Sequence, residues 1–155
     1  MGCGKAAGGG ILPISFVAGR NDIIGTLTPG SEGSTFGGYP LASVVGVYAI
    51  KSLIDEKLTY NAKVRGKQLM QYFNEIKNDF PDKIMEVRGR GLLTAFEMFD
   101  SKHLDGHKVS VELLNNGIYA KETHHSTVRI APSLTVTAVH IDQMAQGIRN
   151  VVANL

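Results

Sequence analysis

Lys5 is an isolated cation in a run of small residues, Gly4-Lys5-Ala6-Ala7-Gly8-Gly9-Gly10. A lysine held in a confined site loses hydration, which lowers the pKa of its amine and lets that amine attack a carbonyl carbon to form a Schiff base. Small neighbours leave space for a flat cofactor. A phosphate-binding P-loop is excluded, because Ala6 stands where the magnesium-binding hydroxyl is required. Lys5 is therefore a candidate nucleophile, and a solvated loop lysine is the alternative.

Two further segments place polar groups where an anion would bind. Ser34 and Thr35 lie shortly before a predicted helix, and hydroxyls together with free backbone N–H groups at a helix entrance favour phosphate. Arg129 interrupts the apolar run 128–132, and its fork of N–H donors matches the two oxygens of a carboxylate. The alternatives are a simple capped loop for Ser34 and Thr35 and a solvent-facing strand arginine for Arg129.

The histidines and the single cysteine do not form a metal-binding pattern. His103 and His107 are four residues apart, but Leu104 stands where the zinc motif H-E-x-x-H has its glutamate. Cys3 has no second cysteine to join it, which excludes an intramolecular disulfide and suits a reducing compartment. The sequence therefore predicts no metal site.

The elements that must position these residues follow from the spacing of apolar side chains. Helices are predicted from Pro40, over 59–79, over 103–116 and over 137–155. Strands are predicted at 84–88, 92–99, 118–121 and 128–131. Gly89-Arg90-Gly91 indicates a bulge or a tight bend, Gly117 is expected just after the third helix, and Thr137 is a candidate N-cap. Strands that alternate with helices predict an α/β fold.

Glycine and charge are unevenly distributed along the 155 residues. The chain is 43% hydrophobic and 19% charged, which is typical of a globular protein and excludes disordered and disulfide-dense classes. A net charge of +2 without a run of Lys or Arg indicates no nucleic-acid surface. Eleven of the 18 glycines lie in residues 1–40. Because glycine raises the entropy cost of ordering, this segment is expected to press against a ligand or other protein.

No apolar stretch approaches the roughly 20 residues of a membrane span, and the first residues lack the pattern of a signal peptide. The sequence therefore predicts a soluble, intracellular protein. The expected partners are small molecules or protein, with no nucleic acid and no membrane.

The order of these segments resembles the class III pyridoxal-phosphate aminotransferases. The resemblance rests on Gly4-Lys5-Ala6, Gly8-Gly9-Gly10, Pro13, Pro29-Gly30, Gly33-Ser34-Thr35-Phe36-Gly37-Gly38, Pro40-Leu41 and Val87-Arg88-Gly89-Arg90-Gly91-Leu92-Leu93. Within that family, the stretches 116–124 and 128–134 look most like the ornithine aminotransferase branch, chiefly through Ala-Lys-x-Thr-His at 120–124. The similarity covers essentially the whole chain.

The resemblance implies a fold-type I pyridoxal-phosphate transferase, with 1–57 as the C-terminal tail of the large cofactor domain and 58–155 as the small C-terminal α/β domain. Lys5 would be the lysine that binds pyridoxal 5′-phosphate covalently and catalyses the reaction. Ser34 and Thr35 would bind the cofactor phosphate, with Thr35 contributed across the interface of a homodimer. Arg129 would hold the substrate α-carboxylate.

The implied reaction is a transamination in which ornithine gives its δ-amino group to 2-oxoglutarate, producing glutamate 5-semialdehyde and glutamate. The acetylornithine and 4-aminobutyrate branches share Lys5 and Thr35 and are alternatives. Family members are much longer, and their other cofactor-binding groups lie upstream of the matched part. The chain is therefore expected to be a C-terminal part that binds the cofactor poorly alone. A non-catalytic remnant or interaction module, in which only 58–155 fold, is the alternative from a different class.

Overall fold

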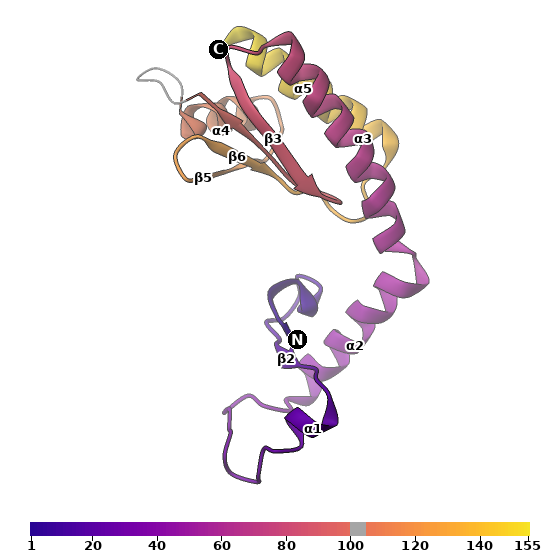
Figure 1. Ribbon diagram of the computed structural model, residues 1–155. Helices are drawn as coiled ribbons and strands as arrows, with labels where there is room; N and C mark the ends of the chain where they lie inside the picture. The colour runs from indigo at the N-terminus through magenta and orange to yellow at the C-terminus, as the bar shows by residue number, and fades with distance from the viewer. Residues whose placement is uncertain (100–104) are drawn as a thin grey trace. The chain divides into compact units, whose positions relative to one another are not determined.

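The structure is a computed structural model that describes residues 1–99 and 105–155 (Figure 1). These residues form two compact units, Met1–Lys57 and Leu58–Leu155. The division falls at Lys57, whose backbone is left-handed with a φ of 52°, directly before the next helix. The assignment of the first unit to a cofactor domain and of the second to a small C-terminal domain stays a prediction.

The first unit contains little regular structure apart from one long helix. Its elements are β1 (Gly2–Cys3), η1 (Lys5–Gly8, a 3₁₀ helix), β2 (Phe16–Val17), α1 (Asn21–Ile24) and α2 (Pro40–Asp55). β1 and β2 pair antiparallel. Pro40 occupies the first turn of α2, which confirms the predicted helix start. Proline suits this position, because its fixed φ is helical and an N–H there would have no intrahelical partner.

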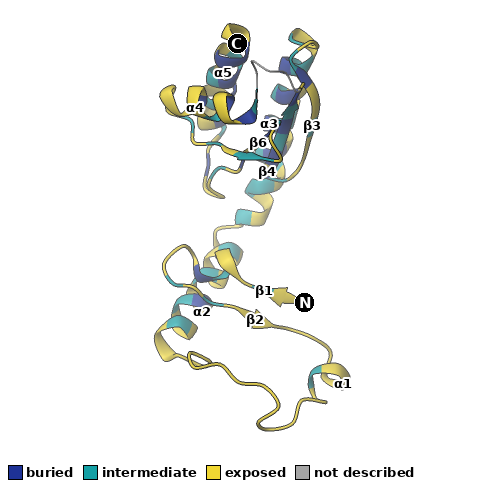
Figure 2. Cartoon of the chain, turned by 90° about the vertical axis from the view of Figure 1, so that its left-hand side faces the viewer, coloured by how far each residue is buried: buried dark blue, intermediate teal, exposed yellow. Residues whose placement is uncertain are grey.

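α2 is apolar around most of its circumference but is covered on one side only. Its one buried residue is Gly46, where a Cβ would lie 2.9 Å from Ile14 Cδ1. The remaining surface of α2 exposes the large apolar side chains of Leu41, Val44, Val47, Tyr48, Ile50 and Ile54. Figure 2 shows the first unit as largely exposed or half-buried. Because a helix that is apolar all round is normally buried, α2 carries an unpartnered apolar surface.

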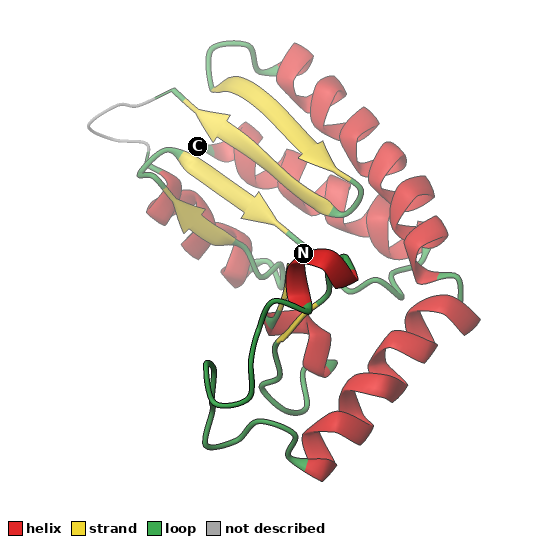
Figure 3. Cartoon of the chain, turned by 60° about the horizontal axis from the view of Figure 1, so that its bottom comes forward, coloured by secondary structure: helices red, strands yellow, loops and turns green. Residues whose placement is uncertain are grey.

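The second unit is an α/β domain built on a four-stranded antiparallel sheet with the strand order β3-β4-β6-β5 (Figure 3). Its elements are α3 (Leu58–Asp79), β3 (Ile84–Arg90), β4 (Leu93–Met98), α4 (Gly106–Asn115), β5 (Lys121–Thr123), β6 (Thr127–Ile130) and α5 (Ala138–Asn154). α3 contacts β3, β4 and α5, whereas α4 contacts β5, β6 and α5. The predicted α/β class is thereby confirmed.

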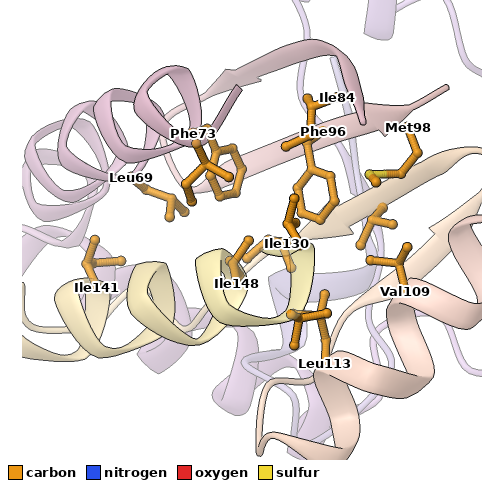
Figure 4. Packing of buried hydrophobic residues seen from close by; sticks show 14 of the residues in the cluster. Leu69, Phe73, Ile84, Phe96, Met98, Val109, Leu113, Ile130, Ile141 and Ile148 are labelled. Atoms are coloured by element: carbon orange, nitrogen blue, oxygen red, sulfur yellow. The ribbon is translucent and has the colours of Figure 1, made fainter. Parts of the chain in front are cut away.

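The core lies between one face of this sheet and the helices α3, α4 and α5. Figure 4 shows apolar side chains from these elements pointing toward one another. At its centre the rings of Phe73 and Phe96 meet edge to face, with their centroids 5.5 Å apart. The fully buried large side chains are Leu69, Phe73, Ile76, Ile84, Phe96, Met98, Val109, Leu113, Val128, Ile130, Ile141 and Ile148. Each such side chain contributes about 1.5–3 kcal/mol through removal from water.

The opposite side of the sheet, called the open face below, carries mainly polar residues. It is formed by the residues that alternate with the core positions, including Glu86, Arg88, Ala95, Glu97, Lys121 and Arg129. Arg88, Lys121 and Arg129 are exposed, while their strand neighbours Val128 and Ile130 are buried. This alternation is what an antiparallel sheet shows when one face packs on the core.

The helices of the second unit agree with the sequence pattern at most of their ends. Thr137 Oγ1 accepts a hydrogen bond of 3.3 Å from the His140 N–H, which confirms Thr137 as the N-cap of α5. Gly117 follows α4 with a φ of 77°, which confirms its place after that helix. α4 begins at Gly106 after the cap Asp105, and the predicted start at His103 lies outside the described residues.

Two strand predictions are wrong in detail. The strand predicted at 118–121 is β5 at Lys121–Thr123, because the Ile118 N–H donates to the Leu113 carbonyl at 2.8 Å and so helps to close α4. The break predicted at Gly89-Arg90-Gly91 is smaller than expected, because β3 continues through Arg90 and pairs it with Leu93. The tight bend lies at Gly91, with a φ of 57°, and the register irregularity lies between Ile84 and Glu86.

Candidate functional site

Lys5 begins the 3₁₀ helix η1 in a left-handed backbone conformation, with a φ of 53°. A residue with a Cβ rarely adopts this region, and such conformations cost about 1–3 kcal/mol and cluster at active sites and ligand clamps. Two open hollows adjoin Lys5, one lined also by Gly10–Ser15 and the other by Gly2–Gly4 and Ser15–Val17. Lys5 therefore combines a strained backbone with free space beside it.

The chain forms this loop because its two flanks are tied together. The terminal amine of Met1 donates to the Ala18 carbonyl at 2.6 Å, and the Ala18 N–H donates to the Met1 carbonyl at 2.9 Å. Between these flanks, Gly9 and Gly10 have positive φ values of 62° and 77°, which turn the chain after η1. Lys5 is nevertheless exposed, so the confined setting expected from its small neighbours is not formed by the described residues.

Ser34 and Thr35 lie together in an exposed turn before α2. The turn is closed by the Gly37 N–H, which donates to the Ser34 carbonyl at 3.0 Å. Neither hydroxyl caps the helix, because the N-cap of α2 is Tyr39 and no side chain caps it. Neither Ser34 nor Thr35 is therefore the cap of α2, and their role in phosphate binding stays a prediction. The hollows beside Lys5 include neither Ser34 nor Thr35 in their lining, so these two residues are close to one another but do not share those hollows with Lys5.

Arg129 lies in the middle of β6, in the second unit, between the buried Val128 and Ile130. Its side chain is on the open face and is exposed. Its cross-strand partners are Ala95 on β4 and Lys121 on β5. Within residues 1–99 and 105–155, no hydrogen bond or ion pair engages its guanidinium. The donors of Arg129 are therefore available to a ligand or to solvent.

Arg88 is another arginine of the open face, and its guanidinium is paired within the domain. Its Nη1 donates to Glu97 Oε2 at 2.6 Å and lies 3.2 Å from Glu86 Oε2, while Nη2 donates to Thr127 Oγ1 at 3.2 Å. The hydrogen bond to Glu97 raises the pKa of Arg88 above its ordinary value, and burial acts against this. Arg88 therefore has a structural role, which the alternation of residues along β3 could have suggested from the sequence.

The described part of the chain contains neither a cluster of metal ligands nor a membrane-spanning helix. There, no three His, Cys, Asp or Glu side chains are grouped so that they could hold a metal ion, and His103 lies outside that part. No helix in residues 1–99 or 105–155 has the length and apolar character needed to cross a membrane.

A model of the family described as aminotransferase class-III matches residues 1–152. The chain belongs to the class-III aminotransferases. Similar curated members include the mitochondrial ornithine aminotransferase of Arabidopsis thaliana, which is 38% identical over 151 residues, and the ornithine aminotransferase of Staphylococcus carnosus, which is 42% identical over 149 residues. Both alignments cover 96% of this chain but only 32% and 36% of the relatives. This class-III aminotransferase chain thus spans about a third of their length.

Solved class-III aminotransferase structures agree with the fold. The ornithine aminotransferase of Toxoplasma gondii, described with partial occupancy of pyridoxal phosphate at its active site, matches with a TM-score of 0.92 and 38% identity. The match covers 99% of this chain and 36% of that protein. The acetylornithine aminotransferase of Elizabethkingia anophelis also matches with a TM-score of 0.92, at 34% identity, over 99% of this chain and 40% of that protein.

Class-III aminotransferases use pyridoxal phosphate, and the donor set of this chain fits part of that cofactor. Lys5 offers a primary amine for its carbonyl carbon, and Ser34 and Thr35 offer hydroxyl donors for a phosphate. No carboxylate lines either hollow beside Lys5, so an acidic partner for the ring nitrogen has to come from outside these linings. The chain therefore carries some of the groups that the cofactor needs.

Proposed function

We propose that this chain takes part in a pyridoxal-phosphate-dependent transamination between ornithine and 2-oxoglutarate. The δ-amino group of ornithine is exchanged for the 2-oxo group, so that glutamate 5-semialdehyde and glutamate form and no other reactant is needed. The observation that carries the proposal is Lys5, because its left-handed backbone beside open space is the kind of strained conformation that clusters at active sites, in a chain of this family. Relatives named ornithine aminotransferase support the choice of donor.

The chain's own residues have separate roles in this reaction. When bound, pyridoxal phosphate supplies a carbonyl carbon for amines and a ring that accepts the electron pair released at the substrate carbon. Lys5 would hold that carbonyl carbon through Nζ, and its amine, when free, would take the proton from the reacting substrate carbon. Ser34 and Thr35 donate hydrogen bonds to the phosphate, and Arg129 holds a substrate carboxylate through two parallel N–H···O bonds.

The first unit acts as part of a larger cofactor domain that includes polypeptide outside this chain. The exposed apolar side chains of α2 support this, because an unpartnered apolar surface of that size normally belongs to an interface. The short span of the match to the relatives supports it as well. In the complete enzyme two subunits pair, and Thr35 contributes to the site of the partner subunit. The compartment is the cytoplasm or the mitochondrial matrix.

The test is to add pyridoxal phosphate to the chain alone and to the chain mixed with the unmatched part of a related ornithine aminotransferase. Borohydride reduction followed by peptide mass analysis then locates the covalently attached cofactor. We expect stoichiometric labelling of Lys5, together with turnover, in the mixture only. Lys5→Ala abolishes both, whereas Lys51→Ala, an exposed lysine on α2, changes neither. Labelling at another lysine, or full turnover after Lys5→Ala, would overturn the role of Lys5.

Arg129 is tested in the same complemented enzyme. Arg129→Ala is expected to raise the KM for the carboxylate substrates by one to two orders of magnitude, because truncating a charged hydrogen-bonding partner costs about 1.5–3 kcal/mol. Unchanged KM values would show that Arg129 does not contact the substrate. A chain that gives no turnover after complementation, although it folds, would favour the non-catalytic interaction module.

A second candidate donor is acetylornithine. It is favoured by the match to the Elizabethkingia anophelis acetylornithine aminotransferase, which has the same TM-score as the Toxoplasma gondii enzyme. The complemented enzyme would be given ornithine and acetylornithine separately, and kcat/KM compared. A higher kcat/KM for acetylornithine would move the assignment to that branch, and a preference for 4-aminobutyrate would exclude both.

A further inference from the structure

Lys121 and Arg129 lie directly opposite one another on the neighbouring strands β5 and β6. Residues in such a pair point to the same face of the sheet, with Cβ atoms about 4.5–5.5 Å apart, and like charges there are destabilising. Both residues are exposed on the open face of the second unit. The domain therefore holds two cations side by side at a place where a cross-strand pair normally combines opposite charges.

No acidic group of the described residues neutralises this pair. Two glutamates of the open face, Glu86 and Glu97, are engaged by Arg88. Glu122 follows Lys121 in the sequence but alternates to the other face, where its Oε2 lies 3.2 Å from His107 Nδ1 on α4. Within residues 1–99 and 105–155, neither Lys121 nor Arg129 forms an ion pair.

The neighbouring position on the same cross-strand row carries a small side chain. Ala95 is the other partner of Arg129, and beyond Ala95 the row continues to Arg88 on β3. The single methyl group of Ala95 separates the free Arg129 from the engaged Arg88, so a group bound to Arg129 meets no large side chain at this position. The row thus provides two unpaired cations next to a small residue.

We propose that Lys121 and Arg129 together form a dicarboxylate site, in which Lys121 is a second binding cation that selects a dicarboxylate over a monocarboxylate. The inference rests on the proposed function, since it takes Arg129 as the arginine that holds a substrate carboxylate. The guanidinium fork binds one carboxylate with two hydrogen bonds, and the Lys121 ammonium, a compact point charge, pairs with the other. A dianion balances both cations, whereas a monocarboxylate leaves one of them unpaired. The substrate that this pair of cations binds is therefore the 2-oxo dicarboxylate.

The test uses the full 155-residue chain without cofactor, with thermal unfolding as the readout and glutarate as the probe. Acetate at equal ionic strength is the monocarboxylate comparison. Glutarate at ten times its Kd is expected to raise the Tm of the second unit by about 7 °C, because a ligand that binds only the native state stabilises it. Acetate is expected to have less than half of this effect. A Tm that does not respond to glutarate overturns the proposal.

Lys121→Gln is the decisive variant, and Lys67→Gln, which removes an exposed lysine from α3, is the matched control. Lys121→Gln is expected to weaken glutarate binding about tenfold and to raise the Tm without ligand by about 2 °C, since it removes the repulsion. Lys67→Gln is expected to change neither the glutarate affinity nor the Tm without ligand. Equal glutarate affinity in Lys121→Gln and the unsubstituted chain overturns the proposal. If Lys121→Gln folds poorly, glutarate titration of the backbone amide signals of residues 121 and 129 in the unsubstituted chain decides instead, and unmoved signals overturn it.

The glutarate experiment and the labelling of Lys5 test the two proposals separately, because either result can be negative while the other is positive. Glutarate binding that depends on Lys121, together with a Lys5 that is not labelled even in the complemented mixture, supports the dicarboxylate site and removes the transamination proposal. Labelling and turnover with a KM for 2-oxoglutarate that is unchanged by Lys121→Gln supports transamination and removes the dicarboxylate site.

Discussion

The hydroxyl of Tyr72 donates a hydrogen bond of 2.8 Å to Oδ1 of Asp142, and this bond joins α3 to α5. The carboxylate oxygen favours the protonated phenol, so the bond raises the pKa of Tyr72 above its ordinary value, with desolvation acting in the same direction. Gln68 Nε2 donates to the same oxygen at 2.6 Å, which fixes the carboxylate against α3. The contact between the two long helices of the second unit is therefore sensitive to alkaline pH.

The first prediction concerns this pH dependence. Because the folded pKa of Tyr72 is above the unfolded value of about 10, its contribution to stability is complete below pH 10 and is lost as the pH rises through the folded pKa. Tyr72→Phe is expected to lower the urea midpoint at pH 7. Between pH 9 and 11, the urea midpoint of this variant is expected to fall less steeply with pH than that of the unsubstituted chain. Tyr60→Phe, an exposed tyrosine on α3, keeps the original slope. Equal slopes of urea midpoint against pH for the unsubstituted chain, Tyr72→Phe and Tyr60→Phe would contradict this prediction.

The second prediction compares two glycines inside helices. A Cβ at Gly66 of α3 would lie 2.2 Å from the Gly91 carbonyl oxygen, which is backbone and cannot move aside easily. A Cβ at Gly147 of α5 would lie 2.6 Å from Ile118 Cδ1, the flexible end of a side chain. Gly66→Ala is therefore expected to lower the free energy of unfolding by about 3 kcal/mol, and Gly147→Ala by less than 1 kcal/mol. Urea unfolding measures both, and similar losses would refute the contrast.

The third prediction concerns strain in the turn between β5 and β6. His124 and His125 both have a positive φ, 51° and 60°, in a turn that favours glycine. His125→Gly is expected to stabilise the second unit by about 0.5–1 kcal/mol, since glycine adopts this conformation without a steric cost. His140→Gly, in the helical backbone of α5, should lower stability by about 1 kcal/mol. Changes of opposite sign in the free energy of unfolding, measured by chemical denaturation, would support this prediction. A loss of stability in His125→Gly would contradict it.

The fourth prediction concerns the apolar surface of α2. Val44 and Val47 are 53% and 56% exposed, so replacing both with Gln removes apolar surface without opening a core. Val44→Gln with Val47→Gln is expected to reduce self-association of the isolated chain in sedimentation experiments while the Tm of the second unit is unchanged. The same double variant should complement the unmatched part of a relative at least tenfold less well. Unchanged complementation would show that this surface of α2 is not an interface.

The sequence predicted the parts of the fold that rest on local signals. Pro40 began a helix and Thr137 capped one, because both act through the first turn of the helix alone. The end of α4 was harder, because the Ile118 N–H closes the helix and shortens the following strand. The sequence pattern predicts that Gly89 lies in a break of the strand. In the structure Gly89 is paired within the hairpin, where a Cβ would lie 2.8 Å from Thr94 Cα, so that only glycine fits. Contacts between strands of this kind are not visible in local patterns.

The candidate site was predictable by residue type but not by arrangement. The small neighbours of Lys5 single it out and predict a confined setting, whereas among the described residues Lys5 is exposed and its backbone is left-handed. Lys121 was not singled out, because its relation to Arg129 appears only once β5 and β6 are paired in register. The sequence signal that could have revealed the pair is the alternation of side chains along the two strands, counted outward from the turn at 124–126.

The buried position of α5 determines when the second unit can fold during synthesis. Ile141, Ile148 and Val152 of this last helix are fully buried against elements made much earlier. α3, β3 and β4 can meet through short-range contacts, but the core between them stays open to water until residue 152 has left the ribosome. The nascent domain is therefore expected to expose Phe73 and Phe96 until α5 docks, and a ribosome stalled before α5 would display a protease-sensitive sheet.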